Sequence, residues 1–146
     1  MHRLPCTTAA LIAVTLTMSN ASFAAALELK TGEHVCFIGN SLADRMQHDG
    51  WLETYIQAAN PDRETVIRNL GFSGDQVVQR PRSHKDFGDP HTHLTHSRAD
   101  VIFAFFGYNE SYKNNATVFK DDLTKFIDEA KTKNYSGKGA PRIVLF

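Results

Sequence analysis

Three short polar segments of this chain contain the residue types that acyl transfer requires. Acyl transfer needs a nucleophile, a base to deprotonate it, and hydrogen-bond donors aimed at the developing oxyanion. Ser41 follows Gly39 and Asn40, where a tight turn would expose its hydroxyl and direct its own backbone amide towards a substrate. Gly74 would bring a second backbone N–H close, because glycine has no Cβ to block the approach. The side-chain amide of Asn109 would supply a third donor, so the three segments together predict a nucleophile and its oxyanion hole.

The segments that must position these residues alternate between strand-like and helix-like patterns. Unbroken apolar runs of β-branched and aromatic residues are typical of strands covered on both faces, as in parallel sheets. Helical spacing of apolar residues follows over 51–59, which Asn60-Pro61 ends, and over 119–130, closed by Asn134 and Gly137; a short helix is expected near 93–97. The alternation predicts a doubly wound, flavodoxin-like α/β fold with a mostly parallel sheet in three α/β/α layers. The expected strands are 34–38, 65–69, 100–106 and 142–146.

The polar segments come directly after the first three expected strands. Gly39-Asn40-Ser41-Leu42 follows the first, Gly71-Phe72-Ser73-Gly74-Asp75 the second, and Gly107-Tyr108-Asn109-Glu110 the third. Functional loops of doubly wound sheets lie at the carboxyl ends of the strands, near the point where the strand order reverses. We therefore expect all three segments to meet at one edge of the sheet.

These segments resemble the sequence blocks of a known enzyme family. The residues Ile-Gly-Asn-Ser-Leu at 38–42 resemble the Gly-Asp-Ser-Leu block that opens the SGNH hydrolases, the GDSL-like lipases and esterases. Residues 69–75 are similar to the second block of that family, and 107–110 are similar to its Gly-x-Asn-Asp third block. The resemblance covers residues 35–146. It implies that Ser41 is the nucleophile, that the amides of Ser41 and Gly74 with the Asn109 side chain form the oxyanion hole, and that no cofactor or metal is required.

Two departures from the family pattern affect the expected activity. Asn40 stands where the family has Asp, and an Asn can make many of the same hydrogen bonds. The family's Asp-x-x-His pair does not occur downstream of Asn109, and the chain ends inside the apolar run 142–146. We expect an incomplete domain over 25–146 that lacks the last strand and helix, and we expect this chain by itself to be a poor hydrolase because its serine has no base.

The resemblance leaves two readings of the function. In the first, the chain belongs to a serine hydrolase of carboxylic or acetyl esters, with a small-molecule or glycan ester as substrate. In the second, it is a non-catalytic carbohydrate- or ester-binding module with a degenerate active site. A flavodoxin-like nucleotide binder is a weaker third reading, because the chain has no Gly-x-Gly-x-x-Gly or Walker-type loop.

The N-terminal residues differ in composition from the rest of the chain. His2 and Arg3 precede an apolar run over 9–18 and then a segment of small residues, an order typical of a secretory signal peptide over residues 1–24. A membrane anchor would need about 20 continuous apolar residues, and this run is shorter and interrupted. We therefore expect a secreted or periplasmic protein with no membrane span after cleavage. Cys36 is then the single remaining cysteine, expected to serve packing.

The charged residues and histidines give weaker signals. The 16 basic and 16 acidic residues balance, and no basic run occurs, which argues against nucleic acid as a partner. Arg80 is expected to be solvated rather than to contact substrate. The sequence leaves the oligomeric state open. A histidine-rich segment has some character of a metal site but lacks the usual ligand spacing, so no metal is expected; its members are His84, His91, His93 and His96.

Overall fold

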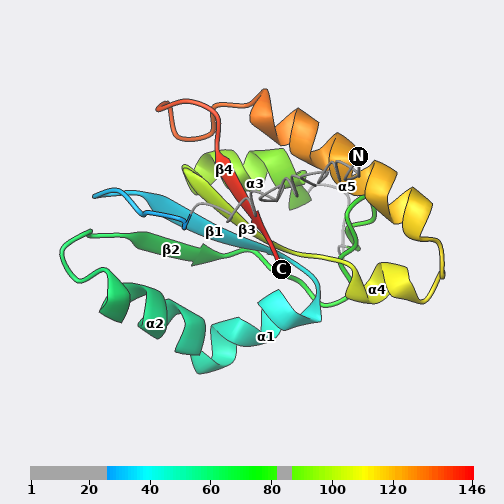
Figure 1. The fold of residues 1–146 in the computed structure, drawn as a ribbon, viewed down its shortest axis with the longest axis horizontal. Helices are drawn as coiled ribbons and strands as arrows, with labels where there is room; N and C mark the ends of the chain where they lie inside the picture. Colours follow the sequence, from blue (N-terminus) through cyan, green and yellow to red (C-terminus); the bar gives the residue numbers. More distant parts are fainter. Residues whose placement is uncertain (1–25, 82–86) are drawn as a thin grey trace, which may run out of the picture.

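A parallel sheet of four strands forms the centre of the fold (Figure 1). The computed structural model describes residues 26–81 and 87–146, so the expected signal peptide lies outside the described residues. The strands are β1 (His34–Gly39), β2 (Val66–Asn69), β3 (Val101–Phe105) and β4 (Arg142–Leu145). The helices are α1 (Ser41–Asp49), α2 (Trp51–Ala59), α3 (Pro90–His96), α4 (Tyr108–Ser111) and α5 (Ala116–Lys131).

The strand order β2-β1-β3-β4 confirms the doubly wound topology. The chain moves from β1 to one side to form β2, then crosses over to form β3 and β4 on the other side. All pairings are parallel, with Phe37 opposite Asn69 of β2 and opposite Phe103 of β3. The strand order therefore reverses at β1, between β1 and β3, which is where such sheets place their ligand crevice.

One face of the sheet packs against α1 and α2. Alternate residues of the central strands point to this face, because successive side chains of a strand lie on opposite sides. Phe37 stacks on Phe103 with 5.5 Å between ring centroids. The partly buried helix residues Met46, Leu52 and Ile56 complete this cluster, whose buried members are Leu29, Val35, Phe37, Ala43, Ile67, Val101, Phe103 and Phe105.

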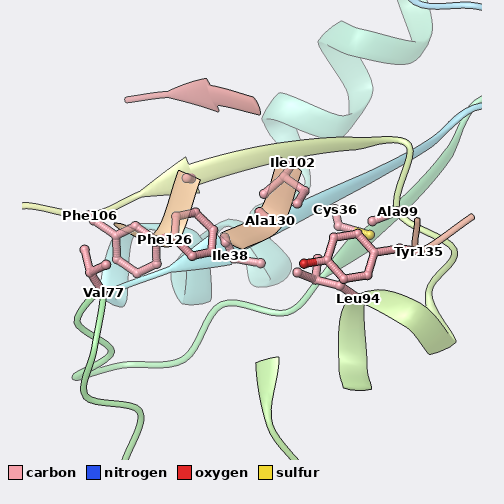
Figure 2. Packing of buried hydrophobic residues seen from close by; sticks show 11 residues of the cluster. Cys36, Ile38, Val77, Leu94, Ala99, Ile102, Phe106, Phe126, Ala130 and Tyr135 are labelled. Carbon is pink, nitrogen blue, oxygen red and sulfur yellow. The ribbon is translucent and has the colours of Figure 1, made fainter. Parts of the chain in front are cut away.

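The other face packs against α3 and α5, which gives the expected three layers (Figures 1 and 2). Leu94 of α3 is fully buried, and Phe126 of α5 meets Phe106 edge to face at 5.9 Å. Figure 2 shows Phe106 and Phe126 at one end of this cluster and Leu94 at the other. Cys36 lies between the layers with no exposed surface, and burial raises the pKa of its thiol to about 12. A thiol in this state serves packing, as the sequence predicted.

The observed elements agree with the four expected strands and with three expected helices, within a few residues at their ends. Two helices were not predicted: α1 directly after β1, and the single turn α4 after β3. The mean hydropathy of α1 is low and Ala43 is its only buried residue, so no apolar stripe marks this mostly polar helix in the sequence. The end of α5 was predicted too late, because the helix stops at Lys131 with Thr132 as its C-cap rather than at Asn134 or Gly137.

No helix within residues 26–81 and 87–146 is long and apolar enough to cross a membrane.

Candidate active site

The three polar segments lie at the carboxyl ends of three adjacent strands, β2, β1 and β3. Hydrogen bonds between the segments join them at this edge. Asn40 N donates to Phe105 O at 3.0 Å, which connects the first segment to the end of β3. Phe72 N donates to Gly39 O at 3.0 Å, which connects the second segment to the end of β1. Residues 39–42, 71–75 and 107–110 together form the site edge.

Gly39 makes the close approach of β1 and β3 possible. Its φ is +125°, a conformation that side-chain-bearing residues rarely adopt. A Cβ at this position would lie 2.1 Å from Phe105 O, inside van der Waals contact with a backbone atom. Only glycine lets the chain leave β1 here and turn at once into α1.

Ser41 is the first residue of α1, and Asn40 caps that helix. The Asn40 side-chain oxygen accepts from Leu42 N at 3.0 Å, and Asn40 O accepts from Asp44 N at 3.1 Å. Asn40 is 4% exposed, so its amide is part of the packed turn. An Asn at this place performs the capping that an Asp would perform, since both offer an oxygen acceptor. N–H groups in the first turn of a helix have no partner within the helix, which suits the Ser41 amide to an oxyanion.

The second segment packs directly on the start of α1. The Asn69 side chain donates to Ala43 O at 2.6 Å and accepts from Gly71 N at 2.8 Å. A Cβ on Gly71 would lie 2.6 Å from the Ala43 Cβ, so this glycine serves close packing. Ser73 Oγ donates to the Asp44 carboxylate at 2.5 Å, which adds a side-chain bond between the same two segments.

Gly74 and Asn109 are joined through Asp75. Gly74 has a φ of +93° in a turn closed by a bond from Asp75 N to Phe72 O at 3.0 Å. Asn109 Nδ2 donates to Asp75 O at 2.9 Å, which places the Asn109 amide one residue from Gly74. An amide nitrogen carries two hydrogens, so this bond uses one donor of Asn109 and leaves the second for another acceptor. The structure thus brings Gly74 and Asn109 close together.

Glu110 fixes the third segment on both sides. Its carboxylate accepts from Gly107 N at 3.0 Å and from Val77 N at 2.7 Å. The first bond closes the N-terminal turn of α4, and the second connects α4 to the segment that follows Asp75. The spacing of three residues between Gly107 and Glu110 is the spacing of a capping box, which indicates the first bond.

Asp75 and Arg80 form a buried ion pair that the sequence did not indicate. Asp75 has no exposed surface, and its carboxylate lies 3.5 Å from an Arg80 nitrogen. The Arg80 side chain is 13% exposed and its guanidinium lies 4.7 Å from the centre of the Phe106 ring. The expectation that Arg80 is solvated is therefore wrong. Its charge is balanced by a buried carboxylate, and its guanidinium lies over an aromatic ring.

Ser41 lines an open hollow with a volume of about 520 Å³. The hollow has aromatic walls and carries Arg45 one turn further along α1. Phe146 stacks on Phe105 with 4.4 Å between ring centroids and forms one side of it. The described lining residues are Asn40, Ser41, Leu42, Arg45, Phe105, Phe106, Tyr108 and Phe146.

Two histidines among the described residues form hydrogen bonds with groups other than Ser41. His34 Nδ1 bonds Ser97 O at 2.8 Å, and His91 Nδ1 bonds the Tyr135 hydroxyl at 2.7 Å. His84 lies outside the described residues. Within the ranges 26–81 and 87–146, no group of three or more metal-ligating side chains comes together. The described part of the chain thus provides a candidate nucleophile and candidate oxyanion donors but identifies no base for Ser41.

Comparison with known proteins gives little further information. No family model matches this chain, and no curated protein matches it. A solved structure of a gut microbial diltiazem-metabolizing enzyme is similar over 81% of this chain, with 22% sequence identity and a TM-score of 0.47. This chain spans 27% of the length of that enzyme. A similarity of this degree does not establish a shared activity.

Proposed function

We propose that this chain carries the nucleophile and the oxyanion hole of an SGNH-type ester hydrolase that acts outside the cytoplasm. The supporting observation is the set of hydrogen bonds that joins the three segments of the site edge. Ser41, Gly74 and Asn109 come from positions far apart in the sequence, and the bonds of Asn40, Phe72 and Asn109 hold their segments against one another. The proposed substrate is a carboxylic or acetyl ester of a small molecule or a glycan.

In the proposed reaction, Ser41 Oγ attacks the acyl carbon of the ester and its proton passes to a base. The carbonyl oxygen becomes an oxyanion, which the amides of Ser41 and Gly74 and the second N–H of Asn109 would bind. The tetrahedral intermediate then releases the alcohol, which takes up the proton from the base, and leaves an acyl group on Ser41. Water hydrolyses this acyl-enzyme to a carboxylic acid and restores the serine. Each oxyanion donor contributes about 3–4 kcal/mol to lowering the barrier in enzymes of this kind.

The base is the component that the described residues do not supply. We expect turnover by this chain at neutral pH to be slow, since loss of one triad member removes most of the rate. Raising the pH replaces the missing base in part, because hydroxide deprotonates a larger fraction of the serine. We therefore predict that Ser41 reacts specifically, but slowly, as a nucleophile.

Covalent labelling tests this proposal. We expect a fluorophosphonate to modify Ser41 preferentially, faster at pH 9 than at pH 7, with modification located by mass spectrometry. Ser41→Ala removes the label, whereas Ser111→Ala is the matched control and leaves it in place, because Ser111 lies outside the hollow and donates to Tyr108 O. Asn109→Ala slows labelling of Ser41. Equal modification of Ser41 and Ser111 in the folded protein contradicts the proposal.

A non-catalytic binding module is the second candidate. It is supported by two histidine hydrogen bonds among the described residues. His34 bonds Ser97 and His91 bonds Tyr135, so neither of these bonds is made to Ser41. Binding of an ester or sugar ester without any Ser41-dependent turnover, at pH 7 and at pH 9, favours this candidate. Ser41-dependent release of the alcohol excludes it.

A further inference from the structure

A second cavity lies apart from the hollow around Ser41. It has a volume of about 230 Å³ and lies between the end of β2 and the start of α3. None of its described lining residues also lines the Ser41 hollow. Its described walls are Ile38, Asn69, Leu70, Gly71, Phe72, Arg80, Phe87, Gly88, Pro90 and His93.

One polar atom in this cavity is buried without a partner. His93 Nε2 is shielded from solvent and forms no hydrogen bond with any of the described residues. Gly88 leaves space beside it, since a Cβ there would lie 3.3 Å from Nε2. A buried polar group without a hydrogen bond is unfavourable, and most such groups in native proteins have a protein or water partner. A ligand in the cavity that bonds Nε2 would therefore gain a contact that the folded chain lacks.

The other polar groups of the cavity wall already have partners. Both ends of the Asn69 amide are used, by Ala43 O and by Gly71 N. The Arg80 guanidinium pairs with the Asp75 carboxylate and donates to Val77 O, so its charge is balanced. Among the described side chains of the wall, His93 Nε2 is the buried polar atom that forms no hydrogen bond, and the Arg80 charge has a carboxylate partner.

The remaining wall is apolar, and aromatic side chains lie where it meets the protein surface. Ile38 and Leu70 contribute aliphatic surface from the sheet, and the Phe87 ring lies 4.9 Å from the His93 ring. Phe72 and Phe87 are large apolar side chains that stay 43% and 44% exposed while lining the cavity. Exposed aromatic residues around a concave site are typical of places where an apolar ligand enters.

We propose that this cavity binds a small, neutral, hydroxylated ring of about the size of phenol. An apolar cavity of about 150 Å³ suffices to hold benzene, so a volume of this order accepts a single ring with one substituent. A histidine nitrogen donates in one tautomer and accepts in the other, and a hydroxyl group can do either. A hydroxyl therefore fits Nε2 in both tautomers, while the ring packs on Leu70, Phe72 and Phe87.

Phenol is the probe, and toluene is its matched control without the hydroxyl. We expect phenol titrated into the full ¹⁵N-labelled chain to give saturable shifts at the amides of Leu70 and Gly88 and not at those of Ser41 and Leu42. Phenol is expected to bind about five-fold or more tightly than toluene, the factor that one hydrogen bond of ordinary strength provides. Equal binding of the two probes, or no saturable binding of phenol, overturns the proposal.

Two substitutions of α3 test the role of Nε2. His93→Leu is expected to weaken phenol binding about five-fold and to leave toluene binding unchanged, whereas His96→Leu on the same helix leaves both unchanged. His93→Gln keeps a side chain that can donate and accept, and it is expected to retain most of the affinity. Unchanged phenol affinity in folded His93→Leu contradicts the proposal; if that variant does not fold, the phenol and toluene comparison in the native chain decides.

Discussion

The residues that could do chemistry fall into two regions, and the fold arranges them differently. The site edge takes its residues from three separate segments of the chain, and hydrogen bonds through Asn40, Phe72 and Asn109 bring these together. The helix α3 holds three histidines within seven residues, and their side chains go to different surroundings. His91 bonds Tyr135 and His93 lines a cavity, while His96 is exposed.

The difference shows that closeness in sequence is a poor guide to a shared site. Residues two positions apart on a helix, such as His91 and His93, point in nearly opposite directions, because each residue turns the helix by about 100°. Residues at the ends of parallel strands point to a common edge whatever their separation along the chain, because parallel pairing aligns those ends. Three changes at or beside the site edge are each compared with a matched change elsewhere, and one change at the contact of α3 with Tyr135 is compared with the native chain.

The largest effect is expected for Gly39→Ala. The new Cβ would lie 2.1 Å from Phe105 O at a φ of +125°, so β1 and β3 must separate at the site edge. We expect a loss of about 4 kcal/mol or more in the free energy of unfolding, measured by urea titration. Gly137→Ala is the control: its φ is +82° but nothing lies within 4 Å of the new Cβ, and it should cost about 1 kcal/mol. Similar losses in the two variants would show that Gly39 acts only through its backbone conformation.

The next largest effect is expected for Asp75→Asn. This change removes the negative charge that balances Arg80 in a place where Asp75 has no exposed surface. Removing one member of a buried ion pair costs about 3 kcal/mol in unfolding free energy. Glu28→Gln breaks the ion pair with Arg63, whose side chains are 82% and 43% exposed, and should cost at most about 1 kcal/mol. Equal costs in these two chemical denaturation experiments would contradict a structural role for the buried pair.

A smaller effect on stability is expected for Asn109→Ala. It removes the bond to Asp75 O that joins the second and third segments, and a bond of this kind contributes about 1 kcal/mol. His96→Ala in α3 changes an exposed residue and should alter the unfolding free energy by no more than about 0.5 kcal/mol. Thermal unfolding followed by circular dichroism distinguishes the two. If the Asn109 variant is as stable as the native chain, the link between these segments does not depend on its side chain.

The smallest effect is a pH dependence at the contact of α3 with Tyr135, which follows the end of α5. Burial raises the pKa of Tyr135 from 10.0 to about 12. The folded state therefore keeps the phenol proton at a pH where the unfolded state has released it, so stability is fully present below pH 10 and declines as the pH rises towards 12. Tyr135→Phe is expected to lose less stability than the native chain between pH 10 and pH 11.5 in urea titrations. The Cys36 thiol titrates in both proteins, so its contribution cancels in the comparison.

The sequence was informative where its pattern had one physical meaning. Runs such as 100–106 are too apolar for anything but a strand covered on both faces, and the structure confirms β3 there. The same reasoning failed for α1, whose residues are mostly polar, and for Arg80, whose partner Asp75 lies five residues away across a loop. Neither a mostly polar helix nor an ion pair formed across a loop produces a run of apolar residues in the sequence.

By itself, the sequence determined the order of the four strands and of three helices, and with it the edge at which Ser41, Gly74 and Asn109 would lie. That much follows from local patterns and from the handedness of parallel crossovers, which allow few arrangements. The tertiary structure alone decided which groups are joined there: Asn109 to Asp75 O, Glu110 to Val77 N, and Asp75 to Arg80. It also decided that His93 lies in a cavity of its own while His91 turns to Tyr135. Such pairings depend on packing between segments distant in sequence, where differences of a few tenths of an ångström decide which contact forms.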